Sequence, residues 1–158
     1  MSVAIELAGL FRRDIARLVQ EVRAFPDETS LWETRPGVAN SAGNLALHLE
    51  GNLRDFIGRQ LGGVEYTRQR ELEFGAKDVP REALAVRLEE VQELVYGTVA
   101  AVTAGQLDAI YPINVLGVEL TTRQFLMHLY GHLSFHLGQM DYLRRVITGD
   151  GALKFVRL

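Results

Sequence analysis

Residues 121–147 read TTRQFLMHLYGHLSFHLGQMDYLRRVI, and this stretch carries the start, the body and the end of one long helix. Thr121 is followed three residues later by Gln124, and the two form a capping box, which is typical of a helix start. Gly149 and Gly151 come directly after the stretch, and glycine commonly ends a helix. The sequence therefore predicts a helix over 121–147.

Three other segments show the same helical signature. Residues 3–25 and 80–102 repeat apolar side chains at steps of three and four, which place them on one face of a helix. Residues 41–61 begin at Ser41, whose hydroxyl can cap free backbone N–H groups, and stop at the glycines 62–63. The apolar stripes are Leu7, Phe11, Ile15, Leu18 and Val22 in the first segment and Leu84, Leu88, Val91, Val95 and Val102 in the third.

The connections between these segments are long. Residues 26–40 are expected to form a loop with a short helical turn, capped by Ser30 and Glu33. Residues 64–79 show no sustained periodicity of apolar side chains, and we expect them to form a long connection that lies over the helices. Residues 105–120 are rich in turn-forming and β-branched residues, and we expect a short extended crossover there.

Four amphipathic helices require a common interior, so the predicted fold is all-α. The natural architecture is a four-helix bundle with long connections, whose topology the sequence leaves open. With 158 residues, 47% hydrophobic and 23% charged, the composition is that of one soluble globular domain spanning residues 1–158.

Charge and cysteine content exclude several classes of function. The formal net charge is −3 and no long basic run occurs, so we expect no nucleic-acid partner. The chain has no cysteine, which excludes disulfides, thiolate metal sites and cysteine nucleophiles. Glu6, Arg12, Arg13 and Asp14 interrupt the first apolar stretch, so it does not match a cleaved signal or a membrane span. We expect a cytoplasmic protein with no membrane partner.

The four histidines lie on two of the predicted helices. His48 is on the second, and His128, His132 and His136 follow one another at i,i+4 spacing on the fourth. Residues four apart rise about 6 Å along a helix, so adjacent imidazoles can meet at one ion. His128 and His136 are about 12 Å apart along the axis, which is too far for both to bind the same ion. The spacing therefore allows either adjacent pair, with His48 as a third ligand.

Three imidazoles would leave part of a metal's coordination sphere open. Such a vacancy is typical of catalytic sites, whereas structural sites are closed by protein ligands. Nitrogen ligands favour a divalent cation such as Zn²⁺ or Ni²⁺. Without an ion, several imidazoles on one inward face would each need another polar partner, so the pattern favours a metal site.

Three stretches occur in an order that matches one protein family. They are LWETRP at 31–36, PGVANSAGNLALHLEGNLRDFIGRQL at 36–61 and HLSFHLGQ at 132–139. Together they resemble the tryptophan loop, the second helix and the H-x-x-x-H-x-G-Q element of the DinB-like (YfiT-like) superfamily. The resemblance implies that the metal ligands are His48, His132 and His136, with His128 as a neighbour. Leu137 stands where many members have arginine.

Further residues are candidates for the surroundings of the site. Asn52 and Gln139 lie on the same stripes as the histidines, and each either lines the open side or orients a ligand, or else satisfies backbone groups in the core. His128 either relays a proton or has a structural role. Trp32 either caps the pocket or plugs the end of the bundle. We find no residue to assign as catalytic.

Two pairs of charged residues are expected on the solvent side of the second helix. Glu50 with Arg54 and Asp55 with Arg59 are each four residues apart, which suits exposed ion pairs of low energy.

The superfamily resemblance also implies a chemistry, since it includes thiol S-transferases and a thiol-dependent isomerase. We therefore expect a metal-dependent thiol S-transferase that activates a low-molecular-weight thiol at an open three-histidine site and joins it to an electrophile. The alternatives are a metal-dependent hydrolase and a non-catalytic protein that binds a metal or a small ligand. We also expect a homodimer, to which the apolar tail at 152–158 could contribute.

Overall fold

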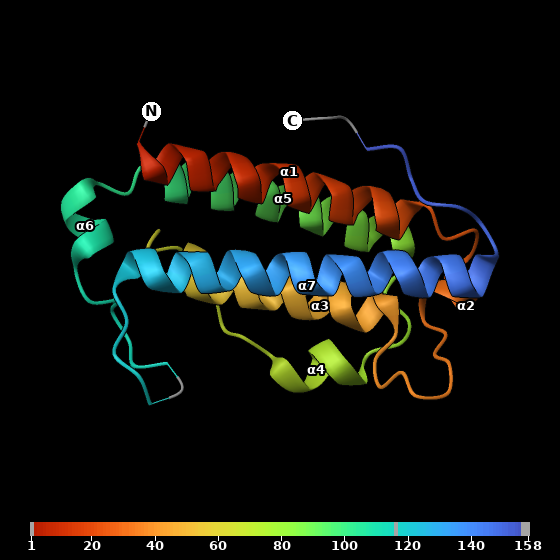
Figure 1. Ribbon diagram of the computed structural model, residues 1–158. Helices are drawn as coiled ribbons and strands as arrows, with labels where there is room; N and C mark the ends of the chain where they lie inside the picture. Colours follow the sequence, from red (N-terminus) through yellow and green to blue (C-terminus); the bar gives the residue numbers. More distant parts are fainter. Residues whose placement is uncertain (1, 116, 156–158) are drawn as a thin grey trace.

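The computed structural model describes residues 2–115 and 117–155. Four long helices run along one another and form a four-helix bundle, as predicted (Figure 1). They are α1 (Val3–Arg23), α3 (Ala42–Leu53), α5 (Arg81–Ala100) and α7 (Thr122–Thr148). The connections hold the shorter α2 (Glu28–Leu31), α4 (Arg70–Gly75) and α6 (Ala104–Asp108), while the π-helical η1 (Arg54–Arg59) prolongs α3.

The packing of the four long helices places α3 and α7 side by side. α1 packs along α5, and α7 contacts both α1 and α3. Figure 1 shows that α3 and α7 run in opposite directions. The interior is one continuous apolar cluster to which all four helices contribute, including Phe11, Leu49, Leu88 and Leu133, each with no exposed surface. Burying such side chains stabilises the fold by about 1.5–3 kcal/mol each.

The predicted starts of two helices are confirmed. The Ser41 hydroxyl accepts a hydrogen bond from the backbone N–H of Asn44 at 3.1 Å. Thr121 and Gln124 form the predicted capping box, in which each side chain bonds the other residue's backbone. Gly149 ends α7 in the left-handed conformation, with a φ of 76° that favours glycine.

The capping box predicted for Ser30 and Glu33 is wrong. The carboxylate of Asp27 caps α2 instead, accepting a hydrogen bond from the Ser30 backbone N–H at 2.7 Å. The short helix therefore begins one turn earlier than the Ser-x-x-Glu pattern indicates. In the later connection, the predicted extended crossover is a short helix, α6, followed by two isolated antiparallel bridges, Ile110 with Thr121 and Val115 with Val118.

The second long helix departs most from its predicted amphipathic pattern. Every residue of α3 is buried, because α4, α5 and α7 all pack against it. Glu50 and Asp55 are therefore only 3% and 8% exposed, and the prediction of solvated pairs is wrong for both. Glu50 is compensated by Arg54 and Arg87, and Asp55 by Arg59.

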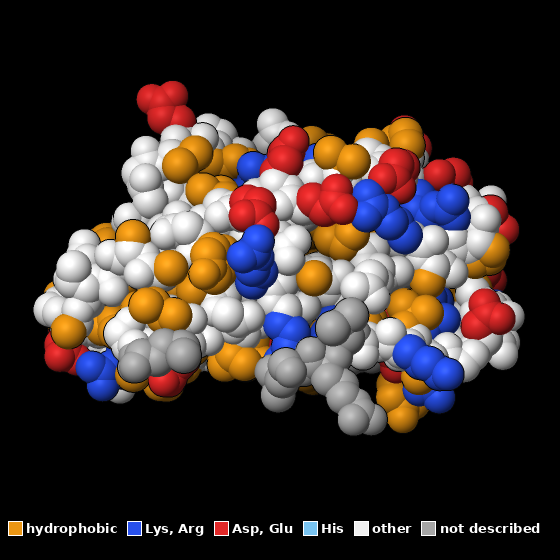
Figure 2. Space-filling view, turned by 90° about the horizontal axis from the view of Figure 1, so that it is seen from above, with side chains coloured by type: hydrophobic (Ala, Val, Ile, Leu, Met, Phe, Trp, Pro, Cys, Tyr) orange, Lys and Arg blue, Asp and Glu red, His pale blue; other side chains and the backbone are white. Residues whose placement is uncertain are grey.

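The outer surface carries charges of both signs. Acidic and basic side chains lie next to one another on the face seen in Figure 2, and ion pairs such as Arg12 with Glu93 and Arg23 with Glu89 join α1 to α5. None of the described helices is both long and apolar enough to cross a membrane. In the tail predicted to support a dimer, the Phe155 ring lies 5.3 Å from the Arg17 guanidinium, and residues 156–158 lie outside the described part of the chain.

A buried ion pair joins the first long helix to the last. Arg144 of α7 is 1% exposed, and its Nε donates to Oε2 of the fully buried Glu21 in α1 at 2.6 Å. The same guanidinium donates to the backbone carbonyl of Gly151 at 3.1 Å, which holds the segment after α7 against the bundle. Burial raises the pKa of Glu21 and the neighbouring Asp141 adds to that shift, while the hydrogen bond and charge of Arg144 oppose it only in part.

Replacing Arg144 with methionine should destabilise the protein by about 3 kcal/mol or more, because Glu21 would stay buried without its cation. Urea unfolding followed by circular dichroism measures this loss. Arg145→Met is the matched control, since Arg145 lies next to it in the sequence but is 36% exposed, and it should cost less than about 1 kcal/mol. Equal losses in the two variants would contradict the role assigned to the buried pair.

Candidate metal centre

Three histidines from two helices converge between α3 and α7. His48 extends from α3, and His132 and His136 extend from successive turns of α7. The Nε2 atom of His132 lies 3.2 Å from Nε2 of His48 and 3.1 Å from Nε2 of His136. One ligand atom from each ring falls within 4.8 Å of the others. The antiparallel packing of the two helices thus brings three imidazole nitrogens to one point.

These distances suit shared coordination of a cation. Metal–nitrogen bonds of about 2.0–2.1 Å with angles between octahedral and tetrahedral values place neighbouring ligand nitrogens about 2.9–3.4 Å apart. Both nitrogen pairs to His132 fall in this range. Of the two pairs that the i,i+4 spacing allows, the structure brings His132 and His136 together with His48. His128 instead is exposed and stacks on Phe125, with ring centroids 5.9 Å apart.

A buried carboxylate sets the orientation of His48. Its Nδ1–H donates to Oε2 of Glu73 in α4 at 2.9 Å, which leaves the Nε2 lone pair directed at the other histidines. Arg68 donates to both carboxylate oxygens, at 2.7 and 2.9 Å. Gly51 permits this approach, because a Cβ atom at that position would collide with the Glu73 carboxylate.

A side-chain amide orients His136 in the same way. The Nδ1–H group of His136 donates to Oε1 of Gln139 at 2.6 Å, so the Nε2 lone pair of His136 faces the other two histidines. Nδ1 of His132 is buried and has no hydrogen-bond partner. The Nε2 lone pairs of His48 and His136 therefore both face Nε2 of His132, and this single nitrogen cannot donate a hydrogen bond to each of them. A divalent cation would satisfy this donor set, so the residues present fit a metal ion.

The lowered pKa values of His48 and His132 keep these two rings neutral, which is the form that binds metals. Burial and the neighbouring histidines together lower the pKa of His132 to about 4, and burial makes the largest contribution. Burial also lowers the pKa of His48, although Glu73 opposes that shift. For Glu73, burial acts to raise the pKa, but the hydrogen bonds and charges of Arg68 and His48 outweigh it and the pKa lies below its ordinary value. The site therefore combines the neutral imidazoles of His48 and His132 with the ionised carboxylate of Glu73 at pH 7.

Sequence reasoning missed Glu73 and Arg68. Both belong to the connection after α3, where the absence of a helical period offered no signal of a functional residue. Glu73 lies 25 residues from His48, so only tertiary packing reveals their contact. The next residue, Phe74, covers the His48 ring at 5.0 Å between centroids, and α4 thereby closes this side of the site.

The structure also places the other predicted site residues. Gln139 contacts His136, as one of its two predicted roles requires. Asn52 is 7% exposed, one turn beyond His48, and its Oδ1 has no hydrogen-bond partner, so a buried acceptor is available there. The Trp32 ring packs on Gly43 at the start of α3.

Taken together, the fold and the histidines define a helical-bundle protein with a candidate metal centre between two antiparallel helices. The chain belongs to the mycothiol-S-transferase family, whose model matches residues 6–149. This match confirms the predicted relationship to the DinB-like superfamily.

Two solved structures share the fold of this chain. A DinB-like protein from Bacillus cereus ATCC 10987 shares 19% identity over 89% of this chain and 91% of its own, with a TM-score of 0.66. A conserved protein from Enterococcus faecalis shares 17% identity over 95% of this chain and 99% of its own, with a TM-score of 0.71. Among curated proteins, none matches the chain significantly.

Replacing His132 with alanine should abolish tight metal binding, because its Nε2 contacts both other ligand nitrogens. His128→Ala is the matched control on the same helix and should leave metal binding intact. Isothermal titration with Zn²⁺ and with Ni²⁺ measures both effects. Loss of binding in His128→Ala together with retention in His136→Ala would reverse the choice of ligands.

Replacing Glu73 with glutamine should weaken metal binding about 10- to 100-fold, because it removes the carboxylate that orients His48. Gly51→Ala should act in the same direction by displacing that carboxylate, although alanine favours a helix by about 1 kcal/mol. Gly97→Ala is the control, since a Cβ there meets no atom within 4 Å. Unchanged metal affinity in both Glu73→Gln and Gly51→Ala would show that Glu73 does not support the site.

Proposed function

We propose that this protein is a metal-dependent S-transferase that joins a low-molecular-weight thiol, such as the mycothiol of its family's name, to an electrophilic carbon. The observation that carries this proposal is the convergence of the His48, His132 and His136 Nε2 atoms within a chain of the mycothiol-S-transferase family. The family match favours thiol transfer over hydrolysis and over simple metal binding.

The three imidazoles would hold a divalent cation, with Zn²⁺ and Ni²⁺ as the cations that nitrogen ligands favour. When bound, such a cation supplies Lewis acidity, which lowers the pKa of a thiol and makes it nucleophilic near pH 7. Three protein ligands leave room for that thiol.

The remaining residues orient the ligands and exclude water. Glu73 and Arg68 fix the ring of His48, and Gln139 fixes the ring of His136. Phe74 shields one side of the site, while Asn52 offers a buried acceptor close to it. In the reaction, the thiol sulfur forms a bond to the electrophilic carbon, and the leaving group departs with the electron pair of the broken bond. The thiol proton passes to solvent.

Mycothiol and 1-chloro-2,4-dinitrobenzene form a suitable substrate pair to test this function. Protein purified without a histidine tag should contain one metal per chain by mass spectrometry and should accelerate formation of the thioether. Chelation should remove the activity and the cation should restore it, because the three imidazoles alone do not activate the thiol. His132→Ala should react at the uncatalysed rate, and His128→Ala should stay active.

Metal-loaded protein that conjugates no thiol, neither mycothiol nor a simpler one, would leave the hydrolase and the non-catalytic alternatives. Hydrolysis of ester or amide substrates by the same preparation would favour the first of these. Retained metal without turnover would favour the second.

Two further features of this proposal concern the cell. We expect the protein to act in the cytoplasm, where low-molecular-weight thiols are kept reduced. A homodimer also stays a prediction, and the exposed Phe135 and Tyr142 on α7 offer apolar surface for a partner chain.

A further inference from the structure

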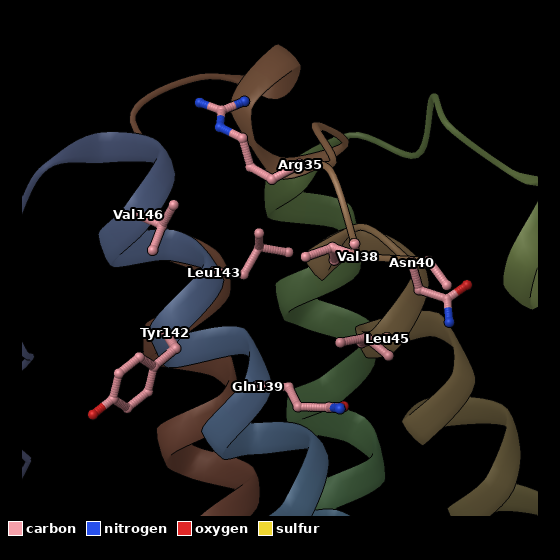
Figure 3. A pocket seen from close by; sticks show the side chains of 10 residues that line it. Arg35, Val38, Asn40, Leu45, Gln139, Tyr142, Leu143 and Val146 are labelled. Atoms are coloured by element: carbon pink, nitrogen blue, oxygen red, sulfur yellow. The ribbon is translucent and has the colours of Figure 1, made fainter.

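A cavity of about 490 Å³ opens beside the candidate metal centre, between α7 and the segment that precedes α3 (Figure 3). This volume suits a small organic molecule. Residues that line it include Arg35, Val38, Leu45, Gln139, Tyr142 and Val146.

One end of the cavity is formed by a side chain that contacts the candidate ligand His136. Gln139 lines the cavity and also accepts the hydrogen bond from Nδ1 of His136 at 2.6 Å. Leu45, across from it, lies one turn before His48 on α3. A molecule in the cavity would therefore have one end next to Gln139, one hydrogen bond away from the His136 ring.

A charged side chain, that of Arg35, lies at the opposite end of the cavity. Figure 3 shows Arg35 beyond Val146, far from Gln139. Among the lining residues, Arg35 is the one whose side chain is charged at pH 7, and the walls between are formed by apolar side chains such as Val38 and Leu143. Gln139 and Val146 are seven residues apart on α7, which corresponds to about 10 Å.

The guanidinium of Arg35 is accessible to a ligand. It pairs with Glu33, and the two side chains are 34% and 38% exposed. An exposed pair of this kind contributes little to stability, so a ligand carboxylate can replace Glu33 at low cost. The planar guanidinium binds carboxylates through two parallel hydrogen bonds.

We propose that this cavity, the acceptor pocket, binds the electrophilic co-substrate, and that this substrate is an apolar molecule with an anionic group about 10 Å from the carbon that is attacked. The inference rests on the proposed transferase function and specifies its substrate class. Arg35 binds the anionic group, and the apolar walls direct the electrophilic carbon toward Gln139. The thiol sulfur bonds to this carbon, whose leaving group departs with the electron pair, and the thiol proton passes to solvent.

Octanoate and octan-1-ol are matched probes for the pocket, because they share a chain length and differ in charge. Titration of the metal-free full chain, followed by NMR chemical shifts, should show binding of both, with octanoate the tighter. Arg35→Gln should weaken octanoate binding about fivefold and leave octan-1-ol unchanged. Arg123→Gln is the control, since Arg123 is also exposed and paired with an acidic residue, Asp108, but lies at the start of α7.

Two more variants separate charge recognition from a structural effect. Glu33→Gln should tighten octanoate binding about two- to fivefold, because it removes the acidic competitor for Arg35. Val38→Trp should weaken both probes, because the indole would fill the pocket. Octanoate binding that is unchanged in both Arg35→Gln and Val38→Trp would overturn the proposal.

Activity provides the second measurement. Metal-loaded protein should add a thiol to 8-bromooctanoate with a lower KM than to 8-bromooctan-1-ol, and Arg35→Gln should remove this difference. Equal KM values for the two bromides in the wild type would contradict anion recognition in the reaction. If octanoate binds as expected but no thiol adds to either bromide, the ligand class of the pocket is supported and the proposed transferase function fails.

Discussion

The structure depends on holding three imidazole lone pairs at one point inside an apolar bundle. Neutral histidines lose hydrogen bonds to water when they are buried, and lone pairs that face one another repel. The helix pairing of α3 and α7 keeps His48 opposite His132 and His136 against this repulsion. Two polar side chains from outside the cluster, Glu73 and Gln139, then fix the tautomers of His48 and His136, so the arrangement fits a cation.

This requirement explains why α3 is buried on all sides. A helix that presents a ligand on one face can leave the opposite face in water, but here α4 packs on it and carries the Glu73 carboxylate to His48. Covering α3 also buries Glu50, whose charge is compensated by Arg54 and Arg87. The charged residues around α3 are thus a consequence of covering the site with α4, a helix that belongs to the connection before α5.

Features that depend on residues close together in the sequence were predicted, and features that depend on distant residues were not. Apolar periodicity and the caps at Ser41 and Thr121 are local, and they predicted the four long helices to within a few residues when η1 is counted as the end of the second one. Helical phase narrowed the histidines to two alternatives, and the family resemblance favoured His136 over His128. The packing of α3 on α7 places His136 in the cluster and His128 outside it. Glu50 was misjudged because i,i+4 spacing does not report how many neighbours cover a helix. Glu73 gave no signal, since its partner is distant in the sequence.

Gln139 couples the two parts of the candidate site. The same amide oxygen that orients His136 lies on a side chain that forms the inner wall of the acceptor pocket. A ligand that moves this side chain would also change the direction of the His136 lone pair, and a bound cation would in turn hold the amide in the wall. By linkage, the factor by which a pocket ligand changes the affinity for the cation equals the factor by which the cation changes the affinity for that ligand. Cation and pocket ligand would therefore be coupled through the His136 ring and its hydrogen bond to Gln139.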